Sequence, residues 1–338
     1  MGMPMPKFSR RSVLACCLAL APALCAAQGG ATRSGLVFGI ITPRAAEQMK
    51  DNWRPFVERL GQSVSMAVEL RAFAESNELV AAFRKGEVDL AWMGNAPALD
   101  VVESGAGAVY AQGITRQGSV GYNSVLVVPI ESPLRSLDDV LAQSKKLRFG
   151  DGDLKSTSGH LVPYYFAFQK HGVNDLAAIF KSVSHASHQK NLTMAAKAEV
   201  DVATANNEEI EFFAHDAPAL ARRLRVIWES PVIPQSPLLW RLALPLDLRR
   251  KILAFTTTFG RDAEQRRILA ELNNLSGFRQ SSNRQLVSVA DIEMFKARQA
   301  INNDLALAAD ERAQRIDEVI RRGSRLDLLL KVSSASAR

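Results

Sequence analysis

The chain has 338 residues, 47% of them hydrophobic, and a formal net charge of +7 at pH 7. This length exceeds the ~250–300 residues that one hydrophobic core usually serves, so we expect more than one folded unit. The basic residues form short clusters broken by acidic or apolar residues, which is typical of solvated helix faces and argues against nucleic-acid binding. The modest positive charge suits small anionic ligands and, equally, ordinary solubility.

The first 27 residues have the features of an export signal. A basic start, a short apolar stretch and a small-residue exit are supplied in turn by Lys7, Arg10, Arg11, residues 13–21, Ala26 and Ala27. The apolar stretch is far below the ~20 residues that span a bilayer. We therefore expect a signal peptide at residues 1–27 and a periplasmic protein, exported by the Sec or the twin-arginine route. All three cysteines lie in or at the edge of this segment, so no disulfide is expected in the mature chain.

Strand-like and helix-like segments alternate along the rest of the chain. Runs such as LVFGII, VDLAWMG and VDVATA are typical of strands, whereas NELVAAFRKG is typical of a helix that ends at Gly86. This alternation predicts strands covered by helices, the α/β class. Near the C-terminus, Ile316, Val319, Ile320 and residues 326–330 form the apolar stripe of a long helix. We expect this stripe to pack on the body of the protein, with a subunit contact as the alternative.

One unit occurs twice, as FRKGEVDLAWMGN at residues 83–95 and as AAKAEVDVATANN at residues 195–207. In each copy a helix ends, a strand begins after Glu-Val-Asp, and a polar turn follows. Ligands of open α/β sheets bind beyond the carboxyl ends of strands, so Asn95 and residues 206–208 are expected to line a cleft. Asp89 and Asp201 recur at the strand start, which indicates a turn or cap role rather than catalysis.

The segment DGDLKSTSGHLVP, residues 151–163, carries the most chemistry. A nucleotide-binding P-loop is excluded because Leu154 stands where its second glycine is needed. Ser156 can cap a helix that starts at Thr157, which leaves the first amides of that helix free to bind an anion. Gly159 would allow close backbone approach, and Pro163 should bend or restart the helix. A plain helix cap with accidental hydroxyls remains an equal alternative.

Several motifs in order resemble one known family. STSGHLVP, SHQKN, VDVATANNEE and VIWESPVIPQSPLLWR, together with FGIITP, VDLAWMGN and GYNSVLVV, resemble the phosphonate-binding proteins that serve phosphonate ABC transporters, over about residues 34–300. The resemblance implies a two-lobed periplasmic binding protein of type II-like fold. Such a fold has two mixed sheets flanked by helices, a cleft between the lobes and two crossing strands. It implies no enzymatic activity and no cofactor.

The resemblance also implies roles for single residues. The phosphonate oxygens would be held by Ser156, Thr157, Ser158 and His188, while Tyr122 and Glu208 would meet the ligand at the cleft. Family positions that differ here fall at Ser76 (or Asn77), at Met93 and at Ser236. The candidate ligand-binding residues, from the motifs and from the resemblance together, are Ser76, Asn95, Tyr122, Ser156, Thr157, Ser158, Gly159, His188, Glu208 and Ser236. No metal ligand is predicted, because His185 and His188 have no third partner at a usual spacing.

The change at Ser236 bears on the ligand. Relatives that take aminoethylphosphonate have a second acid at this place, and a buried ammonium needs compensating negative charge. We therefore expect a smaller or less cationic ligand, such as an alkylphosphonate, phosphite or a phosphate ester. Glu208 could instead accept a hydrogen bond from a protonated P–OH group.

The expected organisation follows from these points. Residues 34–122 and 238–300 would form the first lobe, residues 123–237 the second, and residues 301–338 a C-terminal helix with a disordered tail. The expected partners are a small phosphorus oxyanion and an ABC permease, with the protein a monomer or a homodimer through its C-terminal helix. The alternatives are an exported phosphorus-ester hydrolase and a ligand-sensing accessory protein of the same fold.

Overall fold

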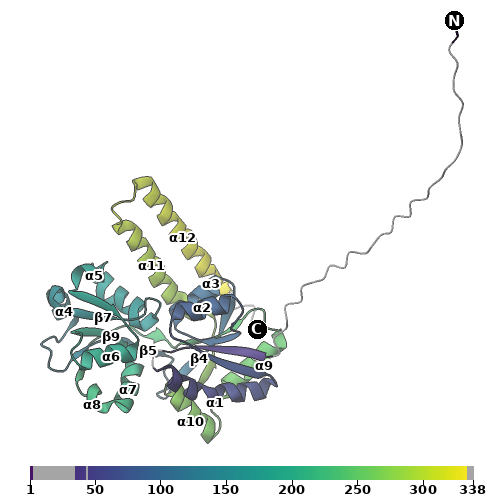
Figure 1. Ribbon diagram of the computed structural model, residues 1–338, viewed down its shortest axis with the longest axis horizontal. Coiled ribbons are helices and arrows are strands. Elements are labelled where there is room, and N and C mark those ends of the chain that lie inside the picture. The colour runs from purple at the N-terminus through teal and green to yellow at the C-terminus, as the bar shows by residue number, and fades with distance from the viewer. Residues whose placement is uncertain (3–34, 43–44, 333–338) are drawn as a thin grey trace. The chain divides into compact units, whose positions relative to one another are not determined.

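The computed structural model describes residues 1–2, 35–42 and 45–332 (Figure 1). Residues 3–27 of the predicted signal peptide and the predicted tail beyond residue 332 lie outside the described residues. Within the described part of the chain, no helix is long and apolar enough to cross a membrane. Residues 35–332 belong to one compact unit that contains two large sheets.

The first sheet has six strands in the order β13-β4-β12-β3-β1-β2. Its strands are β1 (Gly35–Ile41), β2 (Ala67–Phe73), β3 (Leu90–Trp92), β4 (Gly107–Thr115), β12 (Pro237–Arg241) and β13 (Leu275–Gln280). β1 runs parallel to β2 and β3, whereas β12 and β13 are antiparallel to their neighbours, so the sheet is mixed. We call this sheet and its helices the first lobe.

Helices cover both faces of this sheet because its strands are apolar on both sides. One face packs on α1 (Ala46–Val64), α9 (Leu246–Thr258) and α10 (Ala263–Asn273) through Phe38, Leu90 and Trp92. The other face packs on α2 (Ser76–Arg84) and α3 (Asn95–Glu103) through Val37 and Ala91. Neighbouring residues of a strand thus serve opposite cores, as the period of two requires.

The second sheet has five strands in the order β10-β6-β9-β7-β8. Its strands are β6 (Ser124–Pro129), β7 (Arg148–Asp151), β8 (Ser182–His185), β9 (Val202–Asn206) and β10 (Leu224–Glu229). The helices of this region are α4 (Leu137–Gln143), α5 (Leu176–Ile179), α6 (His188–Ala196), α7 (Asn207–Asp216) and α8 (Pro218–Ala221). We call this part the second lobe. The prediction of an α/β fold with two mixed, helix-flanked sheets is confirmed.

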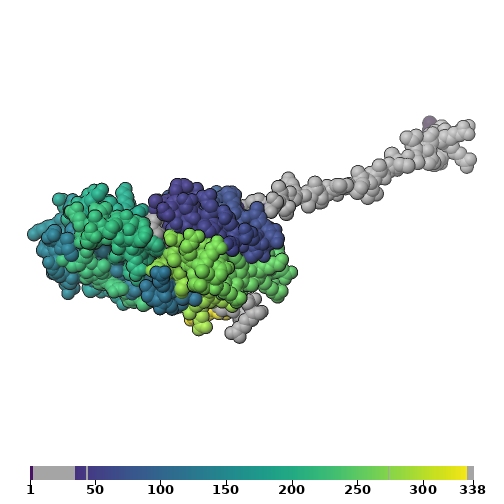
Figure 2. All heavy atoms as spheres, turned by 90° about the horizontal axis from the view of Figure 1, so that it is seen from below, coloured from purple at the N-terminus to yellow at the C-terminus, as the bar shows by residue number. Residues whose placement is uncertain are grey.

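The chain passes between the sheets twice, through β5 (Gly121–Tyr122) and β11 (Ile233–Pro234), which pair antiparallel. In the space-filling view the atoms of the second sheet, coloured teal and green, gather on one side, and the purple and yellow-green atoms of the first lie on the other (Figure 2). The expected lobe limits, 34–122 with 238–300 and 123–237, stay a prediction. Strand membership agrees with them to within a residue, since β12 begins at Pro237.

The repeated Glu-Val-Asp unit has the same role in each lobe. Asp89 Oδ2 accepts from the Val37 amide at 3.0 Å, and Oδ1 pairs with Arg241 at 2.8 Å. Asp201 Oδ2 accepts from the Arg148 amide at 2.7 Å, and Oδ1 pairs with the Arg148 guanidinium at 2.8 Å. Each aspartate therefore joins the start of its strand to the neighbouring strand, as the prediction of a structural role required.

The helices that precede these strands end alike but with different residues. Gly86 follows α2 with φ 73°, and Ala198 follows α6 with φ 55°. Both amides donate to the carbonyl three residues earlier, at 3.0 Å. The left-handed conformation is free of strain for glycine but not for a residue with a Cβ atom. The second copy of the unit therefore carries local backbone strain at Ala198.

The C-terminal segment is a pair of antiparallel helices, α11 (Val287–Asn303) and α12 (Ala309–Val332), which lie side by side (Figure 1). α12 docks on the first lobe through buried Leu326 and Leu330, and its Arg322 makes a two-pronged contact with Glu103 of α3. The predicted apolar stripe is only partly correct. Ile320 and Leu328 point to solvent because they lie off the face that carries Leu326 and Leu330.

Candidate functional site

A cavity of about 650 Å³ lies between the two lobes. Its lining includes most of the predicted binding residues, namely Ser76, Tyr122, Ser156, Thr157, Ser158, His188, Glu208 and Ser236. They come from the start of α2, from both crossing segments, and from the ends of β7, β8 and β9, so the strand-end expectation is met for the second lobe. Their role in ligand binding stays a prediction.

The segment after β7, residues 152–159, is called here the anion loop. Ser156 caps the helix that begins at Thr157, and its Oγ accepts from the Gly159 amide at 3.0 Å. Among the described residues, the amides of Thr157 and Ser158 have no hydrogen-bond partner. The prediction of free amides is therefore correct for two positions and wrong for Gly159, whose amide the cap already occupies.

Gly159 has a different role from the one expected. It is not part of the cavity lining, and its carbonyl accepts from the Gly152 amide at 3.0 Å. A Cβ atom on Gly152 would lie 2.6 Å from the Gly159 backbone. The two glycines therefore let the two ends of the anion loop touch, rather than letting a ligand approach.

The helix that begins at Thr157 is wider than an α-helix. Residues Thr157–Leu161 and Tyr164–Phe168 form π-helical turns. The amides of His160 and Leu161 both donate to the Ser156 carbonyl, at 3.1 and 3.0 Å. Pro163 was expected to bend or restart this helix because it has no amide hydrogen. Instead, wide turns on both sides of Pro163 let the helix continue.

The hydroxyls of the anion loop have defined partners. Thr157 Oγ1 accepts from the Ala96 amide of the first lobe at 2.8 Å. Ser158 Oγ lies 3.2 Å from His188 Nε2 and accepts from Asn206 Nδ2 at 3.2 Å. Because Oγ1 of Thr157 only accepts here, its hydrogen remains available for a ligand oxygen.

His188, at the start of α6, is 7% exposed. Burial lowers the pKa of His188 to about 4, so the ring is neutral at pH 7. Its Nδ1 atom is buried and has no hydrogen-bond partner among the described residues. When Ser158 donates to Nε2, the single ring hydrogen is on Nδ1. The ring then has a spare donor at Nδ1, on a residue that lines the cavity.

Tyr122, Glu208 and Ser236 form a further part of the lining. Burial raises the pKa of Tyr122, with the Ser158 and Ser236 side chains close to its hydroxyl, so the phenol keeps its proton. Glu208 accepts a hydrogen bond from the side-chain amide of Gln235. Gln235 is buried, and its Oε1 accepts from the Ser236 amide at 3.2 Å.

Two of the candidate binding residues, Ser76 and Asn95, belong to the first lobe and lie in different surroundings. Ser76 lines the cavity, and its amide points to Asp153 Oδ2 at 3.4 Å. Asn95 is buried outside the lining, and its amide group bonds to the Pro234 carbonyl at 2.7 Å and to Gln285 at 2.9 Å. The strand-end argument therefore misplaced Asn95, whose side chain supports the crossing segment instead.

Sequence reasoning missed several lining residues, including Glu75, Asp153, Lys155 and His185, whereas Asn206 lines the cavity as expected. Lys155 belongs to the anion loop, but its ammonium pairs with Asp100 of the first lobe at 2.8 Å. Burial and the nearby Asp153 raise the pKa of Glu75. The described residues contain no group of three or more His, Cys, Asp or Glu side chains that could hold a metal ion. The cavity thus offers an oxyanion neutral donors at the helix start.

Comparison with known proteins decides the family. The model of the family "ABC transporter, phosphonate, periplasmic substrate-binding protein" matches residues 38–286. The chain belongs to this family. Members are periplasmic substrate-binding proteins of phosphonate ABC transporters and not enzymes, so the alternative of an exported hydrolase is wrong.

Individual phosphonate-binding relatives support this result. The chain is 35% identical over 300 residues to the phosphonates-binding periplasmic protein of Escherichia coli, a match covering 89% of this chain and 88% of the relative. A Pseudomonas aeruginosa binding protein component of a phosphonate ABC transporter superposes with a TM-score of 0.81 at 35% identity, over 90% of this chain and 99% of the other. Prochlorococcus marinus PhnD1 in complex with methylphosphonate shares the fold, with a TM-score of 0.70 at 19% identity over 78% and 99% of the two chains.

Proposed function

We propose that this phosphonate-binding protein captures a small phosphorus oxyanion that carries no cationic group, such as an alkylphosphonate, phosphite or a phosphate ester. The oxyanion would bind at the start of the helix that follows the anion loop. The lobes would close on it, and the complex would deliver it to the permease in the inner membrane.

The observation that supports oxyanion capture is the set of donors at the helix start. Thr157 and Ser158, which carry free amides and the Thr157 hydroxyl, line one cavity with His188, whose buried Nδ1 is a spare donor. Helix N-termini bind anions because unpaired amides and the helix dipole act together. If Ser156 were only a helix cap and no ligand bound here, these amides and the buried Nδ1 would have no hydrogen-bond partner.

Glu208 and Ser236 of the cavity lining support a ligand without a cationic group. Glu208 already accepts from the Gln235 amide, and Ser236 replaces the second acid found in relatives that take aminoethylphosphonate. A ligand ammonium bound beside Glu208 and Ser236 would therefore meet less negative charge than in those relatives. Among curated relatives, a probable phosphite-binding protein of Prochlorococcus marinus is 25% identical over 200 residues, 58% of this chain and 66% of that protein.

Isothermal titration calorimetry on the mature protein tests this proposal. Methylphosphonate and phosphite are expected to bind at least tenfold more tightly than aminoethylphosphonate, a difference of about 1.4 kcal/mol. Sulfate serves as the control for a tetrahedral anion without phosphorus. Tighter binding of aminoethylphosphonate would refute the ligand class, and no binding of any phosphorus compound would refute the function.

Export and assembly are separate proposals. We propose that residues 1–27 direct export by the Sec or the twin-arginine route. Replacing Arg10 and Arg11 by lysine distinguishes the two routes, because only the twin-arginine route requires the arginine pair.

The exposed Ile320 and Leu328 of α12 favour a homodimer contact through this helix. Light scattering of the wild type and of Leu328→Glu tests that contact, and a monomeric wild type would exclude it.

A further inference from the structure

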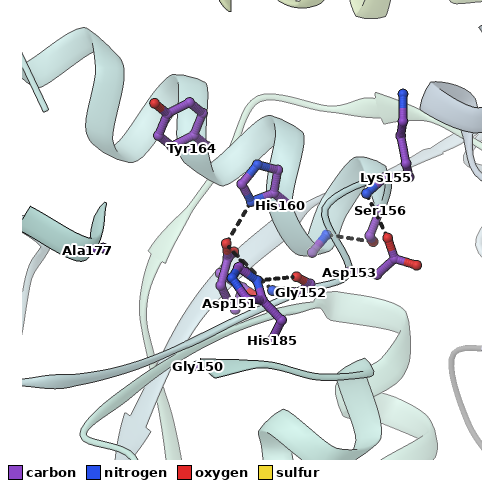
Figure 3. A network of polar contacts seen from close by, with 12 residues as sticks. Gly150, Asp151, Gly152, Asp153, Lys155, Ser156, His160, Tyr164, Ala177 and His185 are labelled. Atoms are coloured by element: carbon purple, nitrogen blue, oxygen red, sulfur yellow. Dashed lines mark hydrogen bonds and ion pairs between the residues drawn. The ribbon is translucent and has the colours of Figure 1, made fainter. Parts of the chain in front are cut away.

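Beneath the anion loop lies a buried carboxylate that contacts two histidines (Figure 3). Asp151 ends β7, and its side chain is 2% exposed. Its Oδ1 accepts from the Gly152 amide at 2.9 Å, while its Oδ2 pairs with His160 Nδ1 at 2.7 Å and lies 3.5 Å from His185 Nδ1. A buried carboxylate requires hydrogen bonds or a cation, and here histidines take the place of the cation.

His185 differs from His160 in its access to the cavity. It ends β8, lines the cavity, and has a side chain that is 47% exposed. His160 is buried and stacks on Tyr164, with ring centroids 5.3 Å apart. His185 is therefore the histidine of this cluster that a ligand can reach.

The contacts of His185 fix which nitrogen carries its hydrogen. Nδ1 lies 3.1 Å from the Gly152 carbonyl, which can only accept, so Nδ1 carries a hydrogen. Nε2 is the nitrogen left for a ligand. In the neutral ring Nε2 presents a lone pair, which repels a phosphoryl oxygen; in the protonated ring it donates to that oxygen.

We propose that His185 matches the charge of the site to that of its ligand: an oxyanion bound at the anion loop draws a proton from solvent onto Nε2 of His185, and Asp151 stabilises the resulting imidazolium. This inference rests on the proposed function and adds a ligand-contact residue to it. It also adds a positive charge to the site when the anion is bound.

The other titratable side chains around the cavity do not supply this charge. Lys155 is paired with Asp100, and His188 stays neutral because burial lowers its pKa to about 4. The remaining groups are the phenol of Tyr122, which keeps its proton, and the acids Glu75, Asp153, Glu208 and Glu209. They could take up a proton near an anion but would not become positive. Removing His185 separates these two sources of proton uptake.

Calorimetry of methylphosphonate binding at pH 7, in buffers of different ionisation enthalpy, measures the protons taken up per ligand. The wild type is expected to take up more protons per ligand than His185→Gln, because the variant has no ring nitrogen that can accept the proton. The contribution of the ligand itself cancels, since both proteins bind the same compound. At pH 6, His185→Gln is expected to bind roughly tenfold more weakly than the wild type, and the difference should shrink by pH 8.5.

Three further variants complete the test. His188→Gln should weaken binding but keep the proton uptake, and His171→Gln, an exposed residue outside the lining, should change neither. Asp151→Asn, once its fold is verified by thermal unfolding, should reduce the uptake while His185 is still present. Equal proton uptake by the wild type and by His185→Gln would assign the proton to the acids. That result would overturn the role of His185 and leave the proposed function unaffected. No binding by the wild type would overturn the proposed function with it.

Discussion

Thr157 of the second lobe accepts a hydrogen bond from the backbone amide of Ala96 of the first lobe, at 2.8 Å. The residue expected to bind the ligand thus also contacts the facing lobe. The nearby pair of Lys155 and Asp100 links the same two segments. In the proposed site, ligand binding and contact between the lobes therefore share one side chain, because the hydroxyl accepts from one lobe and can donate to a ligand.

Thr157→Val keeps the shape of this side chain but removes its hydrogen bonds. Methylphosphonate at 100 times its dissociation constant should stabilise the wild type by about 2.7 kcal/mol, and this thermal shift should disappear in the variant. The melting temperature without ligand should fall moderately, because the buried Ala96 amide loses its acceptor. Thr157→Ser, which keeps the hydroxyl, is the matched control and should retain the shift. A variant that keeps the thermal shift would indicate that the Thr157 hydroxyl contacts Ala96 and not the ligand.

Ser236→Asp should move the preference towards cationic ligands. The added carboxylate would stand near Glu208 and supply charge for a ligand ammonium, so the affinity for aminoethylphosphonate relative to methylphosphonate should rise about tenfold. Calorimetry with both compounds gives the ratio, and Ser236→Asn provides the control of similar size without charge. An unchanged ratio would mean that the tail of the ligand does not reach Ser236.

Ala198→Gly should stabilise the protein. The left-handed conformation of Ala198, with φ 55°, costs ~1 kcal/mol that glycine avoids, so the free energy of unfolding should increase by about 0.5–1 kcal/mol. Gly86→Ala, at the equivalent place in the first lobe, should lower it by a similar amount. Urea denaturation measures both. Destabilisation by Ala198→Gly would show that the gain in unfolded-chain entropy outweighs the strain.

Glu103→Gln should weaken the docking of α12 in a pH-dependent way. The hydrogen bond from Arg322 lowers the pKa of Glu103, so this pair contributes stability above the unfolded-state pKa of ~4.3 and loses it as pH falls through the depressed folded value. Since both side chains are about one third exposed, we expect a loss of about 1 kcal/mol at pH 7. Chemical denaturation from pH 7 down to pH 3 should show the two proteins converging. A constant difference would point to packing instead.

The two mixed sheets, the helix cap at Ser156 and the structural role of the repeated aspartates could be predicted from the sequence. These features depend on local pattern, because strand periodicity, capping residues and Glu-Val-Asp starts are visible in single segments. The docking of the C-terminal helix was also expected, although which leucines it buries was not. The exposed Leu328 shows that an apolar stripe read over several turns overstates the buried face.

Other features required the folded chain. Gln235 meets Glu208 only because a crossing segment passes the start of α7, and no pattern near either residue indicates this contact. From the sequence, His185 was considered as a metal ligand, whereas the pairing of β7 with β8 brings it next to Asp151. Asn95 looked like cleft lining, but its partner Gln285 is distant in the sequence. The wide turns around Pro163 likewise depend on packing.

The direct contact between Gly152 and Gly159 has a kinetic consequence. Because these backbones are bonded to each other, the intervening segment already has its final shape when a ligand arrives, and little ordering remains for the encounter to bring about. Association rates should then be similar for all oxyanions that enter. Selectivity among them would be expressed in how long each one stays bound.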